Sequence, residues 1–277
     1  MPADRPAAPR RPTGFGPGVR RFGRVNWLGL WTLTEREARR FLAVWTQTIA
    51  APLITAGLFL AVFSLGLGPM RGEVLGVPFL QFLAPGIVMM TVIQNAFANT
   101  SSSIVIAKVQ GNIVDTLMPP LSAGEIVAGY LAGGVLRGLV VALALGVAMV
   151  ALLGIGVAHP LWALAFVIVG AGFMAALGML AAIWSDKFDQ MAAITNFVVT
   201  PLAFLSGTFY SVSSLPPGME AALRANPVFY LIDGMRFATI GTSDADPVLG
   251  LAVATLATLA AWALAWHWMR RGYRMKP

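Results

Sequence analysis

Long runs of apolar residues alternate with short polar connections along most of the chain. A helix needs about 20 mostly apolar residues to cross the hydrocarbon core of a bilayer. Six runs reach roughly this length, and each therefore predicts a membrane-spanning helix. Their approximate bounds are 48–66, 79–106, 123–154, 161–184, 191–210 and 248–269.

A shorter helix is expected just before the first run. Thr34 and Glu37 have the spacing of a capping box, in which a hydroxyl and a carboxylate satisfy the N–H groups at a helix start. The segment mixes arginines with large apolar residues, as helices that lie at a membrane surface do. We therefore predict an amphipathic interface helix from Thr34 to about Trp45, with Pro52 turning the chain into the membrane, or else a cytoplasmic extension of the first span. Its charged residues are Arg36, Glu37, Arg39 and Arg40.

The connection between the second and third spans predicts a short, firmly held helix. Asn112 is placed to cap this helix, and Pro119 and Pro120 are placed to end it. Ser122 and Glu125 then form a second capping box, which opens the third span.

The connection between the fifth and sixth spans predicts a pair of short helices. Asn226 can cap the second of them, and Gly241 can end it. The sequence between these two residues is too apolar to stand in water and too short to cross a membrane. It should therefore dip into the outer leaflet or pack on the bundle.

Composition agrees with a membrane protein. Of the 277 residues, 57% are hydrophobic and 11% are charged, whereas soluble domains carry about 25% charged residues. The net charge of +7 is concentrated before the first span and after the last. This distribution indicates cytoplasmic flanks for both termini and gives no basic groove for a nucleic acid.

Three regions follow from this pattern. Residues 1–33 form a basic tail rich in Pro, Gly and Arg, residues 34–273 form one transmembrane domain, and residues 274–277 form a short basic tail. Because the first apolar run begins only near Thr48, no cleavable signal peptide is expected.

Catalytic motifs are missing from the sequence. His159 and His267 belong to no H-E-x-x-H pattern, and the chain has no cysteine, so we expect no metal site and no enzyme activity. A pair such as Ser206 with His159 could meet only in space, and no G-x-S-x-G motif supports it. The three lysines follow Ala, Asp and Met, and a phosphate-binding P-loop needs Gly before Lys. If transport uses ATP, another chain must bind it.

Polar residues inside the spans are candidates for a transport pathway. Thr91, Asn95 and Asn99 are four residues apart and form a strip on one face of the second span, which either lines a path or binds neighbouring helices. Arg137 lies within the third span, where a charge costs at least about 2.5 kcal/mol, unless it reaches the interface. Glu125 is about 18 Å away along the same helix and cannot pair with it. No Asp or Glu lies well inside a predicted span.

The third span also carries closely spaced glycines that permit close helix approach. We predict that they serve packing within the chain rather than contact with a second copy. They are Gly129, Gly133, Gly134 and Gly138.

Four stretches together resemble the permease subunit of ABC-2 type transporters, the membrane half of certain bacterial ATP-binding-cassette exporters. The resemblance covers about Thr34 to Tyr273 and is most specific in the last two stretches. They read FLAPGIVMMTVIQNAFANTSSSI, NIVDTLMPPLSAGEIVAGYLAGGVLRG, FVVTPLAFLSGTFYSVSSLP and NPVFYLIDGMRFATIG.

This resemblance implies an inner-membrane subunit that works as a homodimer or with a closely related permease. Two copies of a cytoplasmic ATP-binding subunit would bind ATP and Mg²⁺, and this chain would bind no cofactor. The interface helix would be a second docking surface, and the outer helices would help to close the pathway. The helix that couples to the ATPase would contain Gly111, Asn112, Asp115, Leu117, Met118 and Pro119. The pathway would lie near Asn95, Asn99, Arg137, Thr200 and Ser206.

A self-sufficient carrier coupled to ions or protons, or a channel, is the alternative from another class. Such carriers often show repeated halves and membrane-embedded carboxylates, and neither is evident here. An adjacent gene encoding a P-loop protein would favour the exporter.

Overall fold

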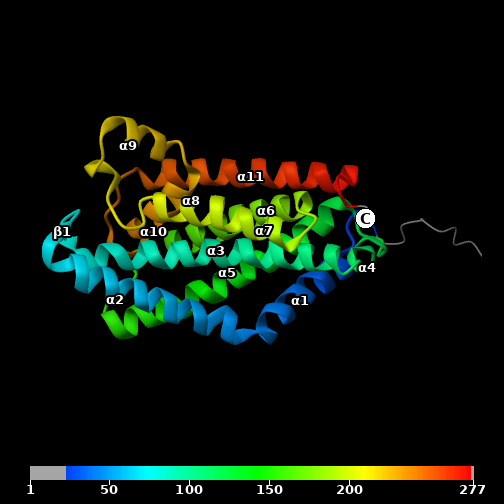
Figure 1. Ribbon diagram of the computed structural model, residues 1–277, viewed down its shortest axis with the longest axis horizontal. Coiled ribbons are helices and arrows are strands. Elements are labelled where there is room, and N and C mark those ends of the chain that lie inside the picture. The colour runs from blue at the N-terminus through cyan, green and yellow to red at the C-terminus, as the bar shows by residue number, and fades with distance from the viewer. Residues whose placement is uncertain (1–22, 276–277) are drawn as a thin grey trace, which may run out of the picture.

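The computed structural model describes residues 23–275 and shows an elongated bundle of helices (Figure 1). Residues 1–22 of the predicted N-terminal tail, and residues 276–277 of the predicted C-terminal tail, lie outside the described part. Within residues 23–275, six helical segments are long and apolar enough to cross a membrane, as the sequence predicted. They are Thr46–Gly66, Phe79–Val109, Ala123–Leu153, Pro160–Trp184, Phe188–Leu205 and Pro247–Arg271.

The elements follow one another with short connections. The first part of the chain forms α1 (Trp27–Ala43), the π-helical η1 (Thr46–Ala50), α2 (Ala51–Arg71), the strands β1 (Glu73–Val74) and β2 (Val77–Pro78), α3 (Phe79–Val109), α4 (Ile113–Leu117), α5 (Ala123–Leu153) and α6 (Pro160–Trp184). The second part forms α7 (Phe188–Ile194), the π-helical η2 (Thr195–Val199), α8 (Thr200–Leu205), the 3-10 turn η3 (Val212–Ser214), α9 (Pro217–Arg224), α10 (Pro227–Ile240) and α11 (Pro247–Arg271).

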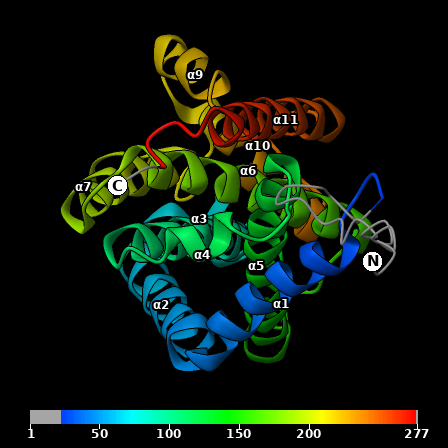
Figure 2. The same cartoon turned by 90° about the vertical axis from the view of Figure 1, so that its right-hand side faces the viewer.

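Helices α3 and α6 form the core of the bundle. Most residues of their apolar stretches are buried, whereas those of α2, α5, α11 and the α7–α8 segment are mostly open. Helix α3 packs on α6, α5, α10 and α2, and α11 covers α6 (Figure 2). The open outer faces are apolar, as expected where lipid rather than water is the solvent.

The glycines of α5 serve packing within the chain, as predicted. An added Cβ at Gly134 or Gly138 would lie 2.6 or 2.7 Å from an alanine Cβ of α6. On the side of α1, an added Cβ at Gly129 would lie 2.6 Å from Leu33 Cδ2, and an added Cβ at Gly133 would lie 2.5 Å from Glu37 Cβ. These positions therefore let α5 approach both neighbours closely.

The two ends of the bundle differ. The start of α1, helix α4 and the C-terminal end of α11 gather at one end, which we call the α4 end (Figure 1). The β1–β2 hairpin, α9 and α10 lie toward the other, which we call the β1 end (Figure 1). Both termini of the described chain thus lie at the α4 end (Figures 1 and 2).

The predicted start of the first helix was wrong. Helix α1 begins at Trp27, and the side chain of Asn26 caps it by accepting from the Gly29 N–H at 2.9 Å. The Thr34 hydroxyl lies inside the helix and donates to the Leu30 carbonyl at 2.9 Å, so Thr34 and Glu37 form no capping box. Seven residues assigned to the tail are therefore helical.

The turn into the membrane also differs from the prediction. Helix α1 ends at Ala43, and the chain changes direction at Val44, before Pro52. Pro52 lies in the first turn of α2, which continues the π-helical η1 without a break, so the proline does not redirect the chain. The fifth span is shorter than predicted, because the chain leaves the helix at Leu205 and turns through Gly207, which has a positive φ of 82°.

Other local predictions are confirmed. Ser122 and Glu125 form the capping box that opens α5, and Asn226 and Gly241 bound α10. Asn112 precedes α4 as predicted, but its side chain caps nothing and donates instead to Gln110 Oε1 at 3.4 Å. Helix α10 is buried against α3, α6 and α11, so it packs on the bundle.

Candidate functional site

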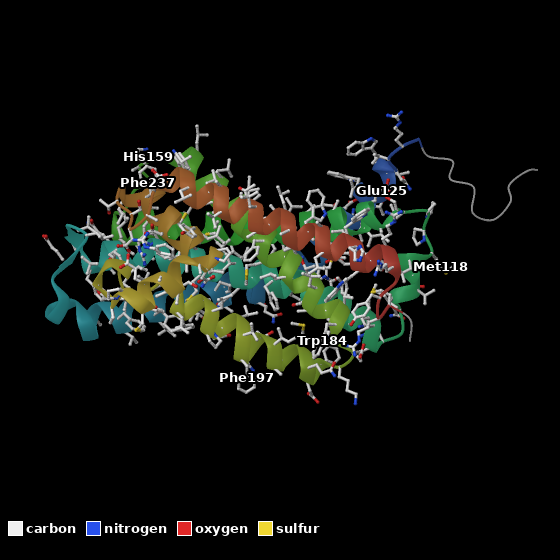
Figure 3. The ribbon with its side chains drawn as sticks, turned by 90° about the horizontal axis from the view of Figure 1, so that it is seen from above. Met118, Glu125, His159, Trp184, Phe197 and Phe237 are labelled. Atoms are coloured by element: carbon white, nitrogen blue, oxygen red, sulfur yellow. The ribbon has the colours of Figure 1, made fainter. Side chains whose placement is uncertain are left out.

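Helix α4 is a short knob held at one end of the bundle. It follows a turn at Gly111, whose φ of 76° suits glycine. Ile113 and Thr116 are buried and attach the helix, while Val114 and Met118 are exposed. Met118, 76% exposed, points away from the bundle (Figure 3). The helix therefore offers an apolar surface while two buried side chains attach it to the bundle.

Two grooves flank α4. One of about 400 Å³ lies between α1 and α4 and is lined by Leu28, Arg36 and Asp115, among others. The other, of about 360 Å³, lies between α4 and the C-terminal segment and is lined by Lys108, Asp186 and other residues. The exposed α4 helix is thus bordered on two sides by concave surface with charged edges.

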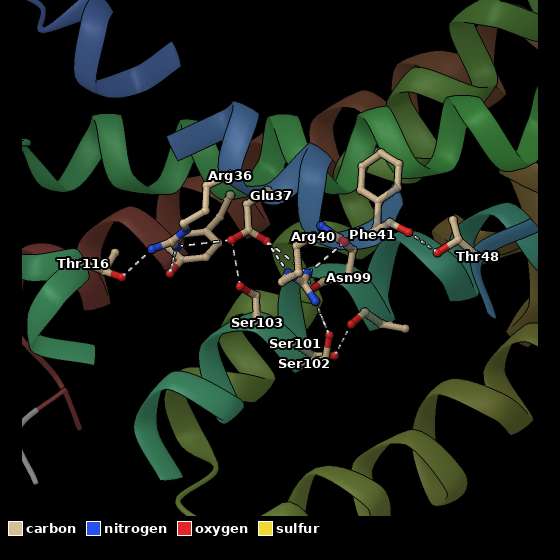
Figure 4. A network of polar contacts seen from close by, with 12 residues as sticks. Arg36, Glu37, Arg40, Phe41, Thr48, Asn99, Ser101, Ser102, Ser103 and Thr116 are labelled. Atoms are coloured by element: carbon tan, nitrogen blue, oxygen red, sulfur yellow. Dashed lines mark hydrogen bonds and ion pairs between the residues drawn. The ribbon is translucent and has the colours of Figure 1, made fainter. Parts of the chain in front are cut away.

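Three charged residues of α1 form a network of polar contacts centred on the buried Glu37 (Figure 4). We call Arg36, Glu37, Arg40, Asn99 and Ser103 the Glu37 cluster. The Glu37 side chain is 0% exposed. Its Oε1 accepts from Ser103 Oγ at 2.8 Å and from Arg36 Nη2 at 3.2 Å, and its Oε2 accepts from Arg40 Nη2 at 3.0 Å. One carboxylate thus holds two guanidinium groups and a hydroxyl of α3.

Arg36 connects this cluster to α4. Its Nη1 donates to Thr116 Oγ1 at 3.1 Å (Figure 4). Its Nη2 donates to Tyr130 Oη of α5 at 3.0 Å. Burial alone would lower the pKa of Arg36, but Tyr130 and Glu37 together raise it above its ordinary value. The guanidinium therefore stays charged and bridges α1, α4 and α5.

Arg40 connects the cluster to α3. Its Nη2 donates to the backbone carbonyl of Asn99 at 2.7 Å and to Asn99 Oδ1 at 2.9 Å. Its Nη1 donates to Ser102 Oγ at 3.3 Å. Through Arg36 and Arg40, displacement of α4 would act directly on α1 and on the central helix α3.

The predicted interface-helix residues therefore have two different roles. Glu37 is buried, and Arg36 and Arg40, although partly exposed, join α1 to its neighbours. Arg39 faces outward, its side chain is 79% exposed, and it pairs only with Glu35 on the same helix among the described residues. The sequence analysis placed these residues on a helix, as the structure does, but it assigned Glu37 to a helix cap and missed its ion pairs.

The predicted pathway residues lie in two places. Asn95 and Arg137 meet, because Arg137 Nη2 donates to Asn95 Oδ1 at 3.0 Å, and Asn99 lies in the Glu37 cluster. Thr200 begins α8 and is half-buried, and Ser206 follows its end, where its Oγ accepts from Asn226 Nδ2 at 2.8 Å. Whether cargo passes any of these residues stays a prediction.

A second charged centre, toward the β1 end, was missed by the sequence analysis. Asp233 and Arg236 of α10 are buried. Arg236 donates to the carbonyls of Gly207 and Thr208, and its guanidinium lies 3.9 Å from the ring centre of Phe82. The sequence does carry a signal for this centre, because an Asp and an Arg stand three residues apart within an otherwise apolar segment.

Asp233 organises the connection before α11. Its carboxylate accepts from the N–H groups of Asp244 and Ala245 at 2.9 and 2.8 Å. Burial raises its pKa to about 6, although these backbone bonds and Arg236 act in the opposite direction. Asp244 in turn accepts from Ser211 Oγ at 2.5 Å. Hydrogen bonds through Asp233 and Asp244 therefore connect α10 with the segment after it and with Ser211 in the segment before it.

Within residues 23–275, no group of three or more His, Cys, Asp or Glu side chains could hold a metal ion. His159 stacks on Phe237 at the β1 end, with ring centres 5.0 Å apart (Figure 3).

Comparison with known proteins identifies the family. The family model of the ABC-2 type transporter matches residues 29–240. The inner membrane transport permease YadH of Escherichia coli K12 is 35% identical over 251 residues, which cover 90% of this chain and 97% of that protein. Nodulation protein J of Rhizobium leguminosarum bv. trifolii is 28% identical over 230 residues, covering 81% of this chain and 85% of that protein. The chain therefore belongs to the ABC-2 type transporter family and is a multi-pass transport permease of the inner membrane.

Proposed function

We propose that this chain is the membrane subunit of an ATP-driven exporter. A separate subunit binds ATP and Mg²⁺ and docks on α4 and on the neighbouring face of α1. The observation that carries the proposal is the mounting of α4, which exposes Met118 while Arg36 joins Thr116 to the Glu37 cluster. A partner that moves α4 therefore also moves the helices that carry this network.

The proposal places the α4 end in the cytoplasm. Cationic residues gather at this end, as expected of cytoplasmic segments. They include Lys108, Lys187, Arg270, Arg271 and Arg274. Because the chain contains no cysteine, single-cysteine variants test this orientation directly. An impermeant maleimide should label Met118→Cys only in inside-out vesicles and Met219→Cys, on α9, only in right-side-out cells.

The proposed assembly contains two permease copies and two ATP-binding subunits. The α2 and α7–α8 segments are mostly open, and they lie on either side of α3 (Figure 2). A second copy covering these faces would enclose the open strip of α3 formed by Gln94, Ala98 and Ser102, and cargo would pass between the copies. The helices at the β1 end would then close the pathway on the outer side.

Two substitutions on α4 test the coupling. Met118→Asp places a charge on its apolar surface, and Asp115→Arg reverses the charge beside the α1–α4 groove. Both variants should insert in the membrane but lose the stimulation of the partner's ATP hydrolysis, and Met118→Asp should also weaken co-purification with that subunit. Met219→Asp is the matched control, because Met219 is also exposed, at 56%, but lies on α9. Normal coupling in both α4 variants would contradict the proposal.

A carrier coupled to protons is the second candidate function, and one observation favours it. Asp233 is a buried carboxylate with a raised pKa, the kind of group that can exchange protons near neutral pH. Membership of the ABC-2 family favours ATP instead. Transport that continues after ATP is exhausted, and stops when the proton gradient is dissipated, would support the carrier.

A further inference from the structure

Arg137 is a charged residue of a membrane-spanning helix that lacks a counter-charge. It is 7% exposed. Its guanidinium donates to Asn95 Oδ1 at 3.0 Å, its Nε has no acceptor, and no carboxylate lies within ion-pair distance among residues 23–275. A buried charge without a partner of opposite sign is strongly unfavourable.

The surroundings of Arg137 add positive charge. Arg40 donates to Asn99, one helical turn along α3 from the Asn95 to which Arg137 donates, so the two guanidinium groups bind neighbouring turns of one helix. The one carboxylate of the adjoining Glu37 cluster is already shared by Arg36 and Arg40. Asn99 Nδ2 also lacks an acceptor within the described part of the chain. Donors and positive charge are therefore in excess, and the complementary group is an anion with oxygen acceptors.

The site borders an open strip of α3. Gln94, Ala98 and Ser102 follow one another at four-residue spacing on this strip, and each is half-buried or exposed. Ser102 already contacts Arg40, whose side chain is 32% exposed. Because the side chains of Ala98 and Ser102 are small, the exposed part of Arg40 borders this strip, and an anionic group could approach it there.

An apolar groove continues the same helices toward the β1 end. It has a volume of about 690 Å³ and is lined by residues of α2, α3 and α5 that are almost all apolar. Its α5 residues Leu145 and Met149 lie eight and twelve residues after Arg137 and, like Arg137, are buried against the rest of the bundle. Val88, which also lines the groove, shares a face of α3 with Asn95. The groove begins about 12 Å from Arg137 along α5.

We propose that Arg137, Arg40 and Asn95 bind the anionic headgroup of an amphiphile whose hydrocarbon chain occupies this groove. The headgroup is a phosphate or a carboxylate, because both match the planar fork of donors on a guanidinium. The groove favours a lipid-like ligand over a free inorganic anion, since it gives a hydrocarbon chain a protein surface to pack on. If this ligand is also cargo, which rests on the proposed function, the transporter selects negatively charged amphiphiles.

Ligand binding to the purified full chain tests the proposal. The melting temperature, followed by tryptophan fluorescence in a nonionic detergent, is measured with dioctanoyl phosphatidic acid, dioctanoyl phosphatidylcholine or sodium phosphate. Phosphatidic acid should raise the wild-type melting temperature in a saturable way, and phosphatidylcholine should not. Arg137→Gln should weaken the apparent affinity for phosphatidic acid at least about tenfold. Arg39→Gln is the matched control and should behave as the wild type, because Arg39 is exposed on α1.

Two further measurements show whether Arg137 binds ligand or only supports the fold. Without ligand, Arg137→Gln should melt no lower than the wild type, because it removes a buried charge that has no counter-charge. Arg137→Lys keeps the positive charge and should bind phosphatidic acid less tightly than the wild type does. The assay contains neither ATP nor a partner subunit, so it does not depend on the proposed function.

Three results would overturn the proposal. Equal stabilisation by both lipids would remove the role of charge, and undiminished binding to Arg137→Gln would remove the role of this residue. Stabilisation by sodium phosphate equal to that by phosphatidic acid would identify a free anion as the ligand and exclude the lipid.

Discussion

Replacement of Glu37 by Gln is the sharpest test of the Glu37 cluster. Glutamine has the shape of glutamate but no charge, and its Nε2 group would face guanidinium donors where Oε1 or Oε2 now accepts. The substitution therefore leaves Arg36 and Arg40 without their shared carboxylate and creates no cavity. Any loss of stability can then be assigned to charge and hydrogen bonding.

The expected magnitude follows from burial. Removing one partner of a buried ion pair costs about 3–5 kcal/mol. Glu37 is fully buried, but the side chains of Arg36 and Arg40 are 48% and 32% exposed, so water screens part of the interaction. We therefore expect a loss at the lower limit, about 3 kcal/mol.

Glu35→Gln is the matched control. Glu35 lies on the same helix and pairs with Arg39, but these side chains are 38% and 79% exposed. An exposed pair of this kind contributes less than about 0.5 kcal/mol. Both variants lose one negative charge from α1, so the comparison isolates the effect of burial.

Unfolding of the purified chain in detergent measures both variants against the wild type. A loss of 3 kcal/mol lowers the melting temperature by roughly 6–12 °C in a chain of this size, 277 residues. Adding Arg40→Met to Glu37→Gln should recover part of the loss, because it removes a guanidinium that has lost its carboxylate. If Glu37→Gln shifts the melting temperature no more than Glu35→Gln does, the buried ion pairs do not hold α1 to α3.

Three further predictions concern stability. Gly133→Leu should lower stability by about 1–3 kcal/mol, because an added Cβ would lie 2.5 Å from the Glu37 Cβ, whereas Gly146→Leu, where nothing lies within 4 Å, should melt as the wild type does. Asp233 has a pKa of about 6 in the folded chain against an ordinary 3.8, so its contribution to stability is greatest below pH 4 and falls by up to about 3 kcal/mol as pH rises through 6. Asp233→Ala should remove this part of the pH dependence of unfolding, and an unchanged slope would exclude Asp233 as its source. Ser122→Ala should cost about 1 kcal/mol by breaking the capping box of α5, and a loss near zero in denaturant unfolding would contradict the capping role.

The spans could be predicted from the sequence because lipid leaves few alternatives. Backbone groups in a bilayer must be bonded within the helix, so an apolar run of sufficient length specifies a spanning helix. Helix starts and ends that depend only on neighbouring residues could also be predicted from the sequence. The capping box at Ser122 and the helix end at Gly241 depend on neighbouring residues alone, and both are confirmed.

Contacts between distant segments could not be predicted in the same way. Thr34 and Glu37 fit a capping box, but Glu37 instead accepts from Ser103 of α3, and Asn26 starts the helix with its N–H bound to Glu125 of α5. Residues this far apart in the chain meet only after the helices have packed. Asn95 and Arg137 were both singled out as polar residues in spans, and only the packing of α3 on α5 shows that they bind each other.

A cross-link from α4 tests most directly whether this chain takes its energy from a separate ATP-binding subunit. The chain has no cysteine, so Met118→Cys gives one attachment point for a photoreactive maleimide at the tip of α4, and Met219→Cys gives one on α9. After illumination of native membranes, position 118 should yield a product that contains an ATP-binding subunit identified by mass spectrometry, and position 219 should not. Absence of that subunit from the product at 118, or equal capture at 219, would contradict the account.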